Sequence, residues 1–501
     1  MRYWKVTGWI ALVLLNALIT IYFFGWIKDD TVKQISNTRS PVVKQEPDDQ
    51  AAVVQSPVVV PEPTSPKYDI HLLFDPVKQT ITGYSTIEVW NRSKAMTDEI
   101  YLQLHLNAFR EGEQAPVLDQ FYKKAYPDGI RFGGIEVETL KVDGRPVPYQ
   151  QEGTVLTVSL EQSWQPQSQK LIELTWTANI PDIHHRTGNE AGRWWFGNLL
   201  PILAVYDGEW HTNGYSVIGD PFFSETADFS VEVETPLGYQ VIATGDETEK
   251  SKSGKLVTKI EASKVRDFAF AITDNTKQMT YRSKTGIELH LYYKKAKEGS
   301  IRELLSLAAD FLDDMSDQVT PYPYAELDIF ENEMFITGME YPGFVLMDAD
   351  RLNDPKGAET LLHEIAHQWF YNLVGNDQVK EPWLDEGFAT FYTDDYLQRK
   401  GLKPKLTQEV ISKAKLNHSL RIGSTDIYSD WSTYWRSNYQ KGSYALFDLK
   451  NHLGSAAFQK LIRDYVTTYQ DEIATIDAFQ NVTKPYLTEQ SSSIFEEWFA
   501  E

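Results

Sequence analysis

Apolar and polar residues alternate with period two along short segments in the first half of the chain. The alternation runs through residues 68–72 and 81–90, and turn sequences at residues 75–76 (DP) and 142–144 (VDG) separate such segments. It recurs in residues 154–160, 171–178, 229–233 and 268–272. Alternation of this kind is typical of strands with one buried face, and frequent turns favour antiparallel pairing. We therefore predict a mostly antiparallel β domain over residues 67–275.

The pattern changes to a helical period after about Thr276. Apolar residues recur at spacings of three and four in residues 300–316, 356–374 and 384–399, and again from Thr407 onward. This spacing places apolar side chains on one face of a helix. We predict a mixed α/β domain over residues 276–501, so the fold class is α+β multidomain.

The amino-terminal residues carry one long apolar run. Residues 8–27 hold no charge, and Arg2 and Lys5 precede them. About 20 apolar residues span the ~30 Å hydrocarbon layer of a bilayer, and a positive flank stays in the cytoplasm. We predict a single-pass transmembrane helix within residues 1–30, which anchors the chain in the cell membrane with its body on the extracytoplasmic side; a cleaved signal peptide is the alternative. Residues 31–66, rich in proline and valine, predict an extended linker.

Composition narrows the classes of function. The 501 residues carry a formal net charge of −23 and include no cysteine. The acidity argues against nucleic-acid binding, which needs a basic face. Without cysteine the chain has no thiol chemistry, so any metal ion must be held by histidine and carboxylate side chains.

The segment 363–367 (HEIAH) combines two histidines and a glutamate at a spacing that suits metal binding. On a helix, His363 and His367 lie one turn apart on the same face, so both imidazoles can converge on one zinc ion. Glu364 lies beside that face, where it can accept a proton from water instead of binding the metal. The alternative is a chance arrangement among the ten histidines of the chain.

A catalytic zinc site needs a third protein ligand and an open fourth position. Eighteen residues separate His367 from Glu386, which lies near the start of the next predicted helix, after Pro382. Proline is well suited to the beginning of a helix. We predict that Glu386 returns beside His363 and His367 and completes a site for one Zn2+ ion per chain.

These motifs resemble those of the aminopeptidase N-like zinc metallopeptidases of the gluzincin group. Residues 363–374 (HEIAHQWFYNLV) resemble the family's metal-binding helix, and residues 383–389 (WLDEGFA) resemble the helix of its third ligand. The family usually has asparagine where this chain has Asp385. The resemblance covers most of residues 68–498 and implies a thermolysin-like catalytic domain. It also implies a bacterial-type member that lacks the C-terminal domains of longer relatives.

Two further motifs of the family match in part. Residues 337–343 (TGMEYPG) resemble its G-x-M-E-N motif, from which Thr337 and Tyr341 depart. The resemblance implies that Glu340 binds the free α-amine of a peptide substrate. The sequence NYQKG around Tyr439 resembles the family's Y-x-K-G, which implies that Tyr439 hydrogen-bonds the developing oxyanion. Taken without the resemblance, Glu340 is an ion-paired strand carboxylate and Tyr439 a buried packing residue.

The sequence thus leads us to expect a zinc aminopeptidase that releases N-terminal residues from peptides outside the cell. Glu364 is the expected general base. Three alternatives stay open. Because of the departures at Thr337 and Tyr341, the first is an endopeptidase or another zinc hydrolase of the same fold. The second alternative is a non-catalytic, tethered binding module, and the third is an enzyme that depends on a partner protein.

Overall fold

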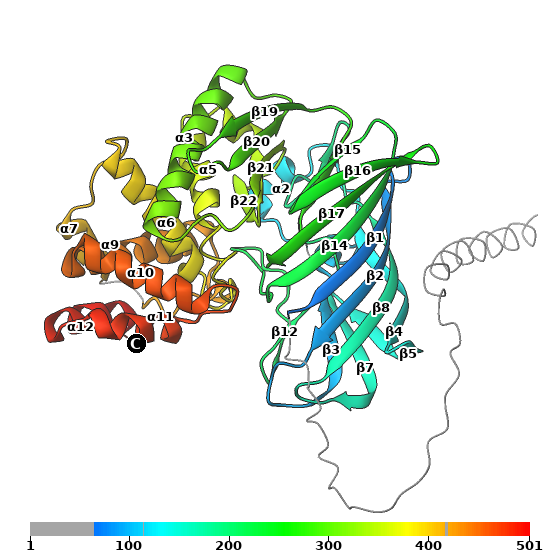
Figure 1. Ribbon diagram of the computed structural model, residues 1–501, viewed down its shortest axis with the longest axis horizontal. Coiled ribbons are helices and arrows are strands. Elements are labelled where there is room, and N and C mark those ends of the chain that lie inside the picture. The colour runs from blue at the N-terminus through cyan, green and yellow to red at the C-terminus, as the bar shows by residue number, and fades with distance from the viewer. Residues whose placement is uncertain (1–64, 114, 416–418, 501) are drawn as a thin grey trace, which may run out of the picture. The chain divides into compact units, whose positions relative to one another are not determined.

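The structure is a computed structural model that describes residues 65–113, 115–415 and 419–500 (Figure 1). These residues belong to one compact unit. No helix in this part of the chain combines the length and the apolar character needed to cross a membrane. The predicted anchor at residues 8–27 lies outside the described residues, and so does the predicted linker except for its last two residues.

The alternating segments of the first half build an eight-stranded sheet with the order β16-β17-β14-β1-β2-β8-β4-β5. Along β2 every second side chain is buried, which is the burial that a period-two sequence predicts. All neighbours pair antiparallel except β1 and β14, which run parallel. The strands are β1 Lys67–Asp75, β2 Thr80–Trp90, β4 Gly134–Val142, β5 Arg145–Pro146, β8 Gln169–Asn179, β14 Ala227–Pro236, β16 Asp246–Lys252 and β17 Lys255–Val265.

Three smaller sheets complete the β-rich part, with the orders β11-β3-β7-β6, β15-β18-β10-β9 and β12-β13. Buried side chains of the eight-stranded sheet share one core with those of the smaller sheets; Ile87, Ile100 and Phe270 are examples. The strands are β3 Thr97–Gln103, β6 Tyr149–Glu152, β7 Val155–Trp164, β9 Thr187–Glu190, β10 Arg193–Phe196, β11 Ile202–Leu203, β12 Val205–Tyr206, β13 Trp210–His211, β15 Gln240–Ala243 and β18 Phe270–Thr273.

A five-stranded sheet follows, with the order β19-β20-β21-β23-β22. Strands β20, β21 and β23 run parallel, and β19 and β22 are antiparallel to their neighbours. The strands are β19 Lys277–Arg282, β20 Glu288–Tyr293, β21 Glu326–Asn332, β22 Gly338–Tyr341 and β23 Phe344–Asp348. The domain boundary predicted at residue 275 falls between β18 and β19. The described residues form a single compact unit, so this boundary remains a prediction.

The two faces of the five-stranded sheet pack against different partners. Leu291 and Ile329 point into a core shared with the helices. Tyr292 and Phe330, on the opposite face, pack with Trp195 of the sheet that contains β10. Successive residues of a strand point to opposite faces, so near-continuous apolar strands suit a sheet that is buried on both sides. The sheet thereby joins the β-rich part to the helices.

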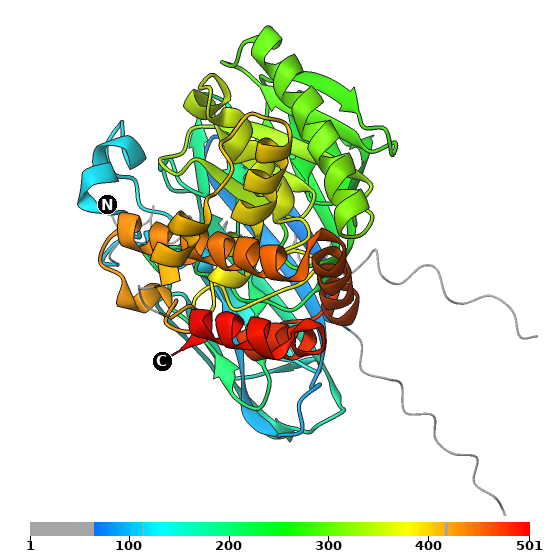
Figure 2. The same cartoon turned by 90° about the vertical axis from the view of Figure 1, so that its left-hand side faces the viewer.

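Apart from one short helix in the β-rich part, the helices belong to the second half of the chain, and Figure 2 shows the C-terminal ones, orange to red, facing the viewer. Helix α3 packs on β19 and β20, and α5 packs on β22 and β23. The helices are α2 Tyr122–Ala125, α3 Glu298–Gln318, α4 Ala349–Leu352, α5 Gly357–Ala366, α6 Trp383–Arg399, α7 Gln408–Lys415, α8 Trp431–Trp435, α9 Lys441–Leu453, α10 Ser455–Tyr469, α11 Ile476–Thr483 and α12 Glu489–Glu496. One π-helical turn, Arg436–Gln440, lies between α8 and α9.

The helix predicted over residues 356–374 is shorter than its apolar pattern indicates. Helix α5 ends at Ala366, and Tyr371 adopts a φ of 103°, which a helix does not allow. The side chain of Arg266 donates to the carbonyl oxygen of Tyr371 at 2.8 Å and holds this turn. Trp369 and Phe370 are nevertheless buried. The apolar spacing in this segment therefore reflects buried side chains and not a continuing helix.

Candidate active site

The two predicted histidine ligands come from the end of α5 and the residue after it. His367 caps the helix with φ −62° and ψ −15°, still in the helical region. Its backbone N–H donates to the carbonyl oxygen of His363 at 3.3 Å. The helical turn therefore extends far enough to keep both imidazoles on one face.

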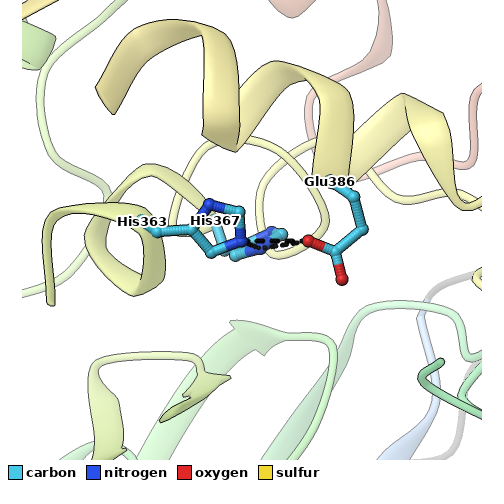
Figure 3. Close-up of side chains that lie close together, drawn as sticks. All are labelled: His363, His367 and Glu386. Atoms are coloured by element: carbon cyan, nitrogen blue, oxygen red, sulfur yellow. Dashed lines mark hydrogen bonds and ion pairs between the residues drawn. The ribbon is translucent and has the colours of Figure 1, made fainter. Parts of the chain in front are cut away.

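Glu386 reaches the same point from the first turn of α6. Its Oε2 lies 3.0 Å from Nε2 of His363 and 3.3 Å from Nε2 of His367, and the two Nε2 atoms lie 3.1 Å apart (Figure 3). Ligand atoms bound tetrahedrally to one zinc ion at ~2.1 Å lie about 3.4 Å from each other. The three atoms, which we call the donor triangle, have the spacing that a zinc ion requires.

Neighbouring groups orient the donor triangle. Nδ1 of His367 lies 3.0 Å from the carbonyl oxygen of Phe370, which can only accept, so Nδ1 carries the proton and Nε2 keeps its lone pair. The hydroxyl of Tyr439 donates to Oε1 of Glu386 at 2.6 Å, and the Tyr439 ring stacks on the His363 ring with centroids 5.5 Å apart. Two imidazoles and one carboxylate, each held by a further group, fit a zinc ion with one open position.

Glu364 lies beside the donor triangle and is not part of it. A carboxylate oxygen of Glu364, one of Glu340 and a ring nitrogen of His367 all lie within 4.8 Å of one another. Gly338 of β22 closes over the buried Glu364 side chain, since a Cβ at Gly338 would lie 2.2 Å from its Oε1. Burial, and after it the charge of Glu340, raises the pKa of Glu364 well above its usual range. Such a carboxylate is a strong proton acceptor when ionised.

Glu340 lies on β22 and faces the same space. Its Oε1 accepts a hydrogen bond from Nε2 of Gln378 at 3.0 Å, and its backbone carbonyl accepts one from Nδ2 of Asn372 at 2.7 Å. Burial raises the pKa of Glu340 to about 7. A buried carboxylate of this kind is stabilised by a cationic group brought next to it.

Two polar residues of this site were not predicted to be functional. Nε2 of Gln378, in the loop before α6, donates both to Glu340 and to Oδ2 of Asp385, the latter at 2.7 Å. Oδ1 of Asp385 accepts the backbone N–H of Glu386 at 2.9 Å. Burial, and then the charge of Glu386, raises the pKa of Asp385 well above its usual range. No periodicity marks Gln378, because it lies in an irregular loop.

Tyr439 lies in the π-helical turn between α8 and α9. Single π turns within helices occur frequently at functional sites. Burial, and then the charge of Glu386, raises the pKa of Tyr439 well above its usual value, so its phenol keeps the proton and remains a hydrogen-bond donor.

The donor triangle, Glu364, Glu340 and Tyr439 all line one cavity of about 770 Å3. Arg186 and Asp220, which form an ion pair, reach this cavity from the β-rich part. The structure therefore brings all six predicted site residues to one place.

The two departures from the family's motif lie differently with respect to this cavity. Thr337 lines it. The hydroxyl of Tyr341 instead donates to Oδ1 of Asn198 at 2.6 Å, in a buried position where Gly197 leaves room for the ring: a Cβ there would lie 1.9 Å from the hydroxyl oxygen. The change at Tyr341 is thus accommodated outside the lining of the cavity.

The donor triangle, built from neighbouring helices, has the geometry of a zinc site. Residues 305–498 match the model of the Peptidase family M1 domain. The resemblance to aminopeptidase N-like gluzincins is therefore confirmed, and this family implies one zinc ion per chain, which the donor triangle fits.

Curated relatives are similar over part of their length. Aminopeptidase M1-B of Oryza sativa subsp. japonica is 28% identical over 207 residues, which cover 37% of this chain and 23% of the rice protein. Aminopeptidase M1 of Arabidopsis thaliana is 24% identical over 48% of this chain and 30% of its own length. The matched regions thus span well under half of these relatives.

Solved structures match over a larger share of the chain. A mutant of the M1 zinc metallopeptidase from Deinococcus radiodurans with a bound Tyr-Ser-Ala substrate superposes with a TM-score of 0.64 and 19% identity. The match covers 87% of this chain and 94% of that one. At this identity the comparison establishes the shared fold, a β-rich part followed by a helical part.

Proposed function

We propose that the chain is a zinc-dependent aminopeptidase that hydrolyses the first peptide bond of peptide substrates. The supporting observation is that Glu340 lies close to the predicted ligand His367: its carboxylate lies within 4.8 Å of a ring nitrogen of that residue. An α-ammonium group paired with Glu340 is two bonds from the carbonyl carbon of the first residue. Glu340 would therefore bring the carbonyl of the first residue, in preference to one further along the peptide, next to the residues that would hold the metal.

The remaining groups suit hydrolysis of that bond. Zinc, when bound, supplies a Lewis acid that polarises the carbonyl and acidifies water. Glu364 takes the proton of the attacking water on its carboxylate and passes it to the leaving amine. Tyr439 donates its hydroxyl hydrogen to the carbonyl oxygen as negative charge develops there. The names of the relatives and the tripeptide bound to the Deinococcus enzyme support peptides as the substrates.

An endopeptidase is the second candidate, because Thr337 departs from the family's motif and lines the cavity. The two candidates differ in their need for a free amine. We expect the protein to cleave an aminoacyl reporter amide and to leave the N-acetylated form of the same amide intact. Comparable kcat/KM values for both reporters would refute the aminopeptidase and favour the endopeptidase.

A variant tests whether Glu340 is the group that recognises the amine. Glu340→Gln keeps the shape of the side chain and removes its charge. Loss of a buried, charge-assisted contact costs about 1.5–3 kcal/mol, so kcat/KM on the free-amine reporter should fall about 10- to 100-fold or more. Glu303→Gln, on the exposed part of α3, is the matched control and should leave kcat/KM unchanged. An equal result for both variants would show that Glu340 does not bind the amine.

We also propose that the enzyme acts on the outer side of a membrane to which residues 8–27 tether it. The support is the uncharged apolar run that follows Arg2 and Lys5. Expressed at full length, the protein should remain in the membrane fraction after alkaline carbonate washing, and protease added to intact cells should release its body. A variant without residues 1–30 should be recovered without membranes. Full recovery of the complete chain in the carbonate wash would refute the tether.

A further inference from the structure

A second group of metal-ligating side chains lies on the five-stranded sheet, outside the lining of the active-site cavity. His290 of β20 is the register partner of Asp328 of β21, and Glu288 is the partner of Glu326. Because neighbouring strands in register point corresponding side chains to the same face, these four groups form one polar patch. The patch lies on the face that carries Tyr292, the face packed toward the β-rich part.

Three donors of this patch converge. One potential ligand atom each from His290, Glu326 and Asp328 lies within 4.8 Å of the other two, and Nε2 of His290 lies 3.2 Å from Oε2 of Glu326. Ligand atoms that share one ion at ~2.1 Å are at most about 4.2 Å apart, so only a small side-chain shift is needed. Nδ1 of His290 lies 2.8 Å from Oγ1 of Thr280 and 3.1 Å from the side-chain amide of Gln278, and these two contacts fix the direction of the ring.

The Asp328 carboxyl is buried without a group, within the described part of the chain, that compensates its polarity. The residue is 1% exposed, and its Oδ1 has no hydrogen-bond partner among the described residues. A proton on Nε2 of His290 satisfies Glu326 but leaves Asp328 without a partner. Burying a carboxylate with no compensating group costs several kcal/mol at least.

The neighbouring carboxyl groups add further negative charge. Among the residues that the structure describes, no lysine or arginine forms an ion pair with Glu326, Asp328 or the nearby Glu247. Glu288 differs from these three, because it pairs with Arg282. The patch therefore has an excess of negative charge around one imidazole, which suits a divalent cation.

We propose that His290, Glu326 and Asp328 bind a second divalent transition-metal ion, in a structural site separate from the catalytic one. An imidazole together with carboxylates is a donor set for zinc or manganese, whereas calcium and magnesium prefer oxygen alone. The side chain of Glu326 is 32% exposed, which gives an ion access from solvent. Bound there, the ion joins β20 to β21 and neutralises charge next to the β-rich part.

Metal stoichiometry tests the proposal directly. The full chain is stripped with a chelator, loaded with excess Zn2+ or Mn2+, desalted and analysed by inductively coupled plasma mass spectrometry. We expect two zinc ions per native chain and one per chain for His290→Gln and for Asp328→Asn. The matched control is His71→Gln, which alters an imidazole beside Asp69 and Glu232 on the surface of β1. This control protein should still bind two zinc ions. One ion in the native protein, or two in both site variants, would overturn the proposal.

A second measurement tests the proposal even if one of these variants folds poorly. In the chain that carries His363→Gln and His367→Gln, the catalytic site is disabled and the proposed site is intact. Added Zn2+ should raise its midpoint of thermal unfolding, because a ligand that binds only the folded state stabilises it. Combining these changes with Asp328→Asn, which preserves the shape of the side chain, should abolish the increase. A midpoint that Zn2+ leaves unchanged in the first protein would show that an ordered water or a proton balances Asp328 instead.

Discussion

Replacing Tyr439 with phenylalanine removes one hydroxyl and little else. The phenylalanine ring can keep the stacking on His363, whose ring plane lies 8° from that of Tyr439. The lost hydroxyl donates to Oε1 of Glu386 at 2.6 Å when no substrate is bound. During the proposed reaction the same hydroxyl turns to the carbonyl oxygen on which charge develops.

The expected magnitude follows from this exchange of partners. Removing one oxyanion donor typically lowers kcat about 10²- to 10³-fold, or roughly 2.7–4 kcal/mol. Here the hydroxyl gives up a charge-assisted bond to Glu386 before it reaches the oxyanion, so the net gain is smaller than for a donor without a prior partner. We therefore expect the lower end, about a 10²-fold loss of kcat. KM should change less than about three-fold, because the donor acts mainly in the transition state.

Steady-state kinetics on an aminoacyl reporter amide, with zinc content measured in parallel, provide the assay. Tyr434→Phe is the matched control: Tyr434 is buried, its ring lies 6.0 Å from the Tyr439 ring, and its hydroxyl has no hydrogen-bond partner among the described residues. It should retain kcat within about three-fold, since it loses no donor to the reaction. A Tyr439→Phe protein that binds zinc and keeps more than a third of the native kcat would refute the reasoning. So would a loss that appears only in KM.

Four further predictions concern the site, the core and pH. Gly338→Ala puts a Cβ 2.2 Å from Oε1 of Glu364, so the carboxylate must move and kcat should fall about 10- to 100-fold with zinc retained; native kcat would contradict this. Gly83→Ala puts a Cβ 2.1 Å from the rigid indole of Trp176, so urea unfolding should show a loss of about 2–3 kcal/mol, and an unchanged midpoint would contradict the packing. Chelation should abolish activity and lower the thermal midpoint, and zinc should restore both; activity that survives complete metal removal would exclude the zinc mechanism. Burial raises the pKa of Asp267 from 3.8 to about 7, so the folded state binds this proton more tightly than the unfolded state does. The free energy of unfolding should therefore fall as the pH rises from 3.8 to about 7. Asp267→Asn should flatten that part of the stability profile, and an unaltered slope would contradict the assignment.

Local sequence patterns predicted the elements better than their pairing. The alternation in residues 81–90 predicted a strand because a strand with one buried face needs that period, and β2 shows it. The parallel pairing of Lys67–Asp75 with Ala227–Pro236 carries no such mark, since the pairing of distant strands depends on the packing of the whole sheet. The end of α5 was misjudged for a related reason. Apolar residues from Trp369 onward keep a helical spacing while they fill the core from an irregular turn.

The donor triangle and the proposed second metal site also differ in how much of each the local sequence pattern shows. His363 and His367 are four residues apart on one helix, so coordination geometry is already present in the local sequence. At the second site the local signal is weaker. The sequences E-L-H at residues 288–290 and E-L-D at residues 326–328 each place two polar groups on one face of a strand. Either pair alone is an ordinary strand pattern. Only the parallel register that sets His290 beside Asp328 makes them one group of donors, and that register depends on contacts between segments far apart in the chain. A helical metal motif is therefore visible in the sequence, whereas a site assembled across strands becomes visible only in the fold.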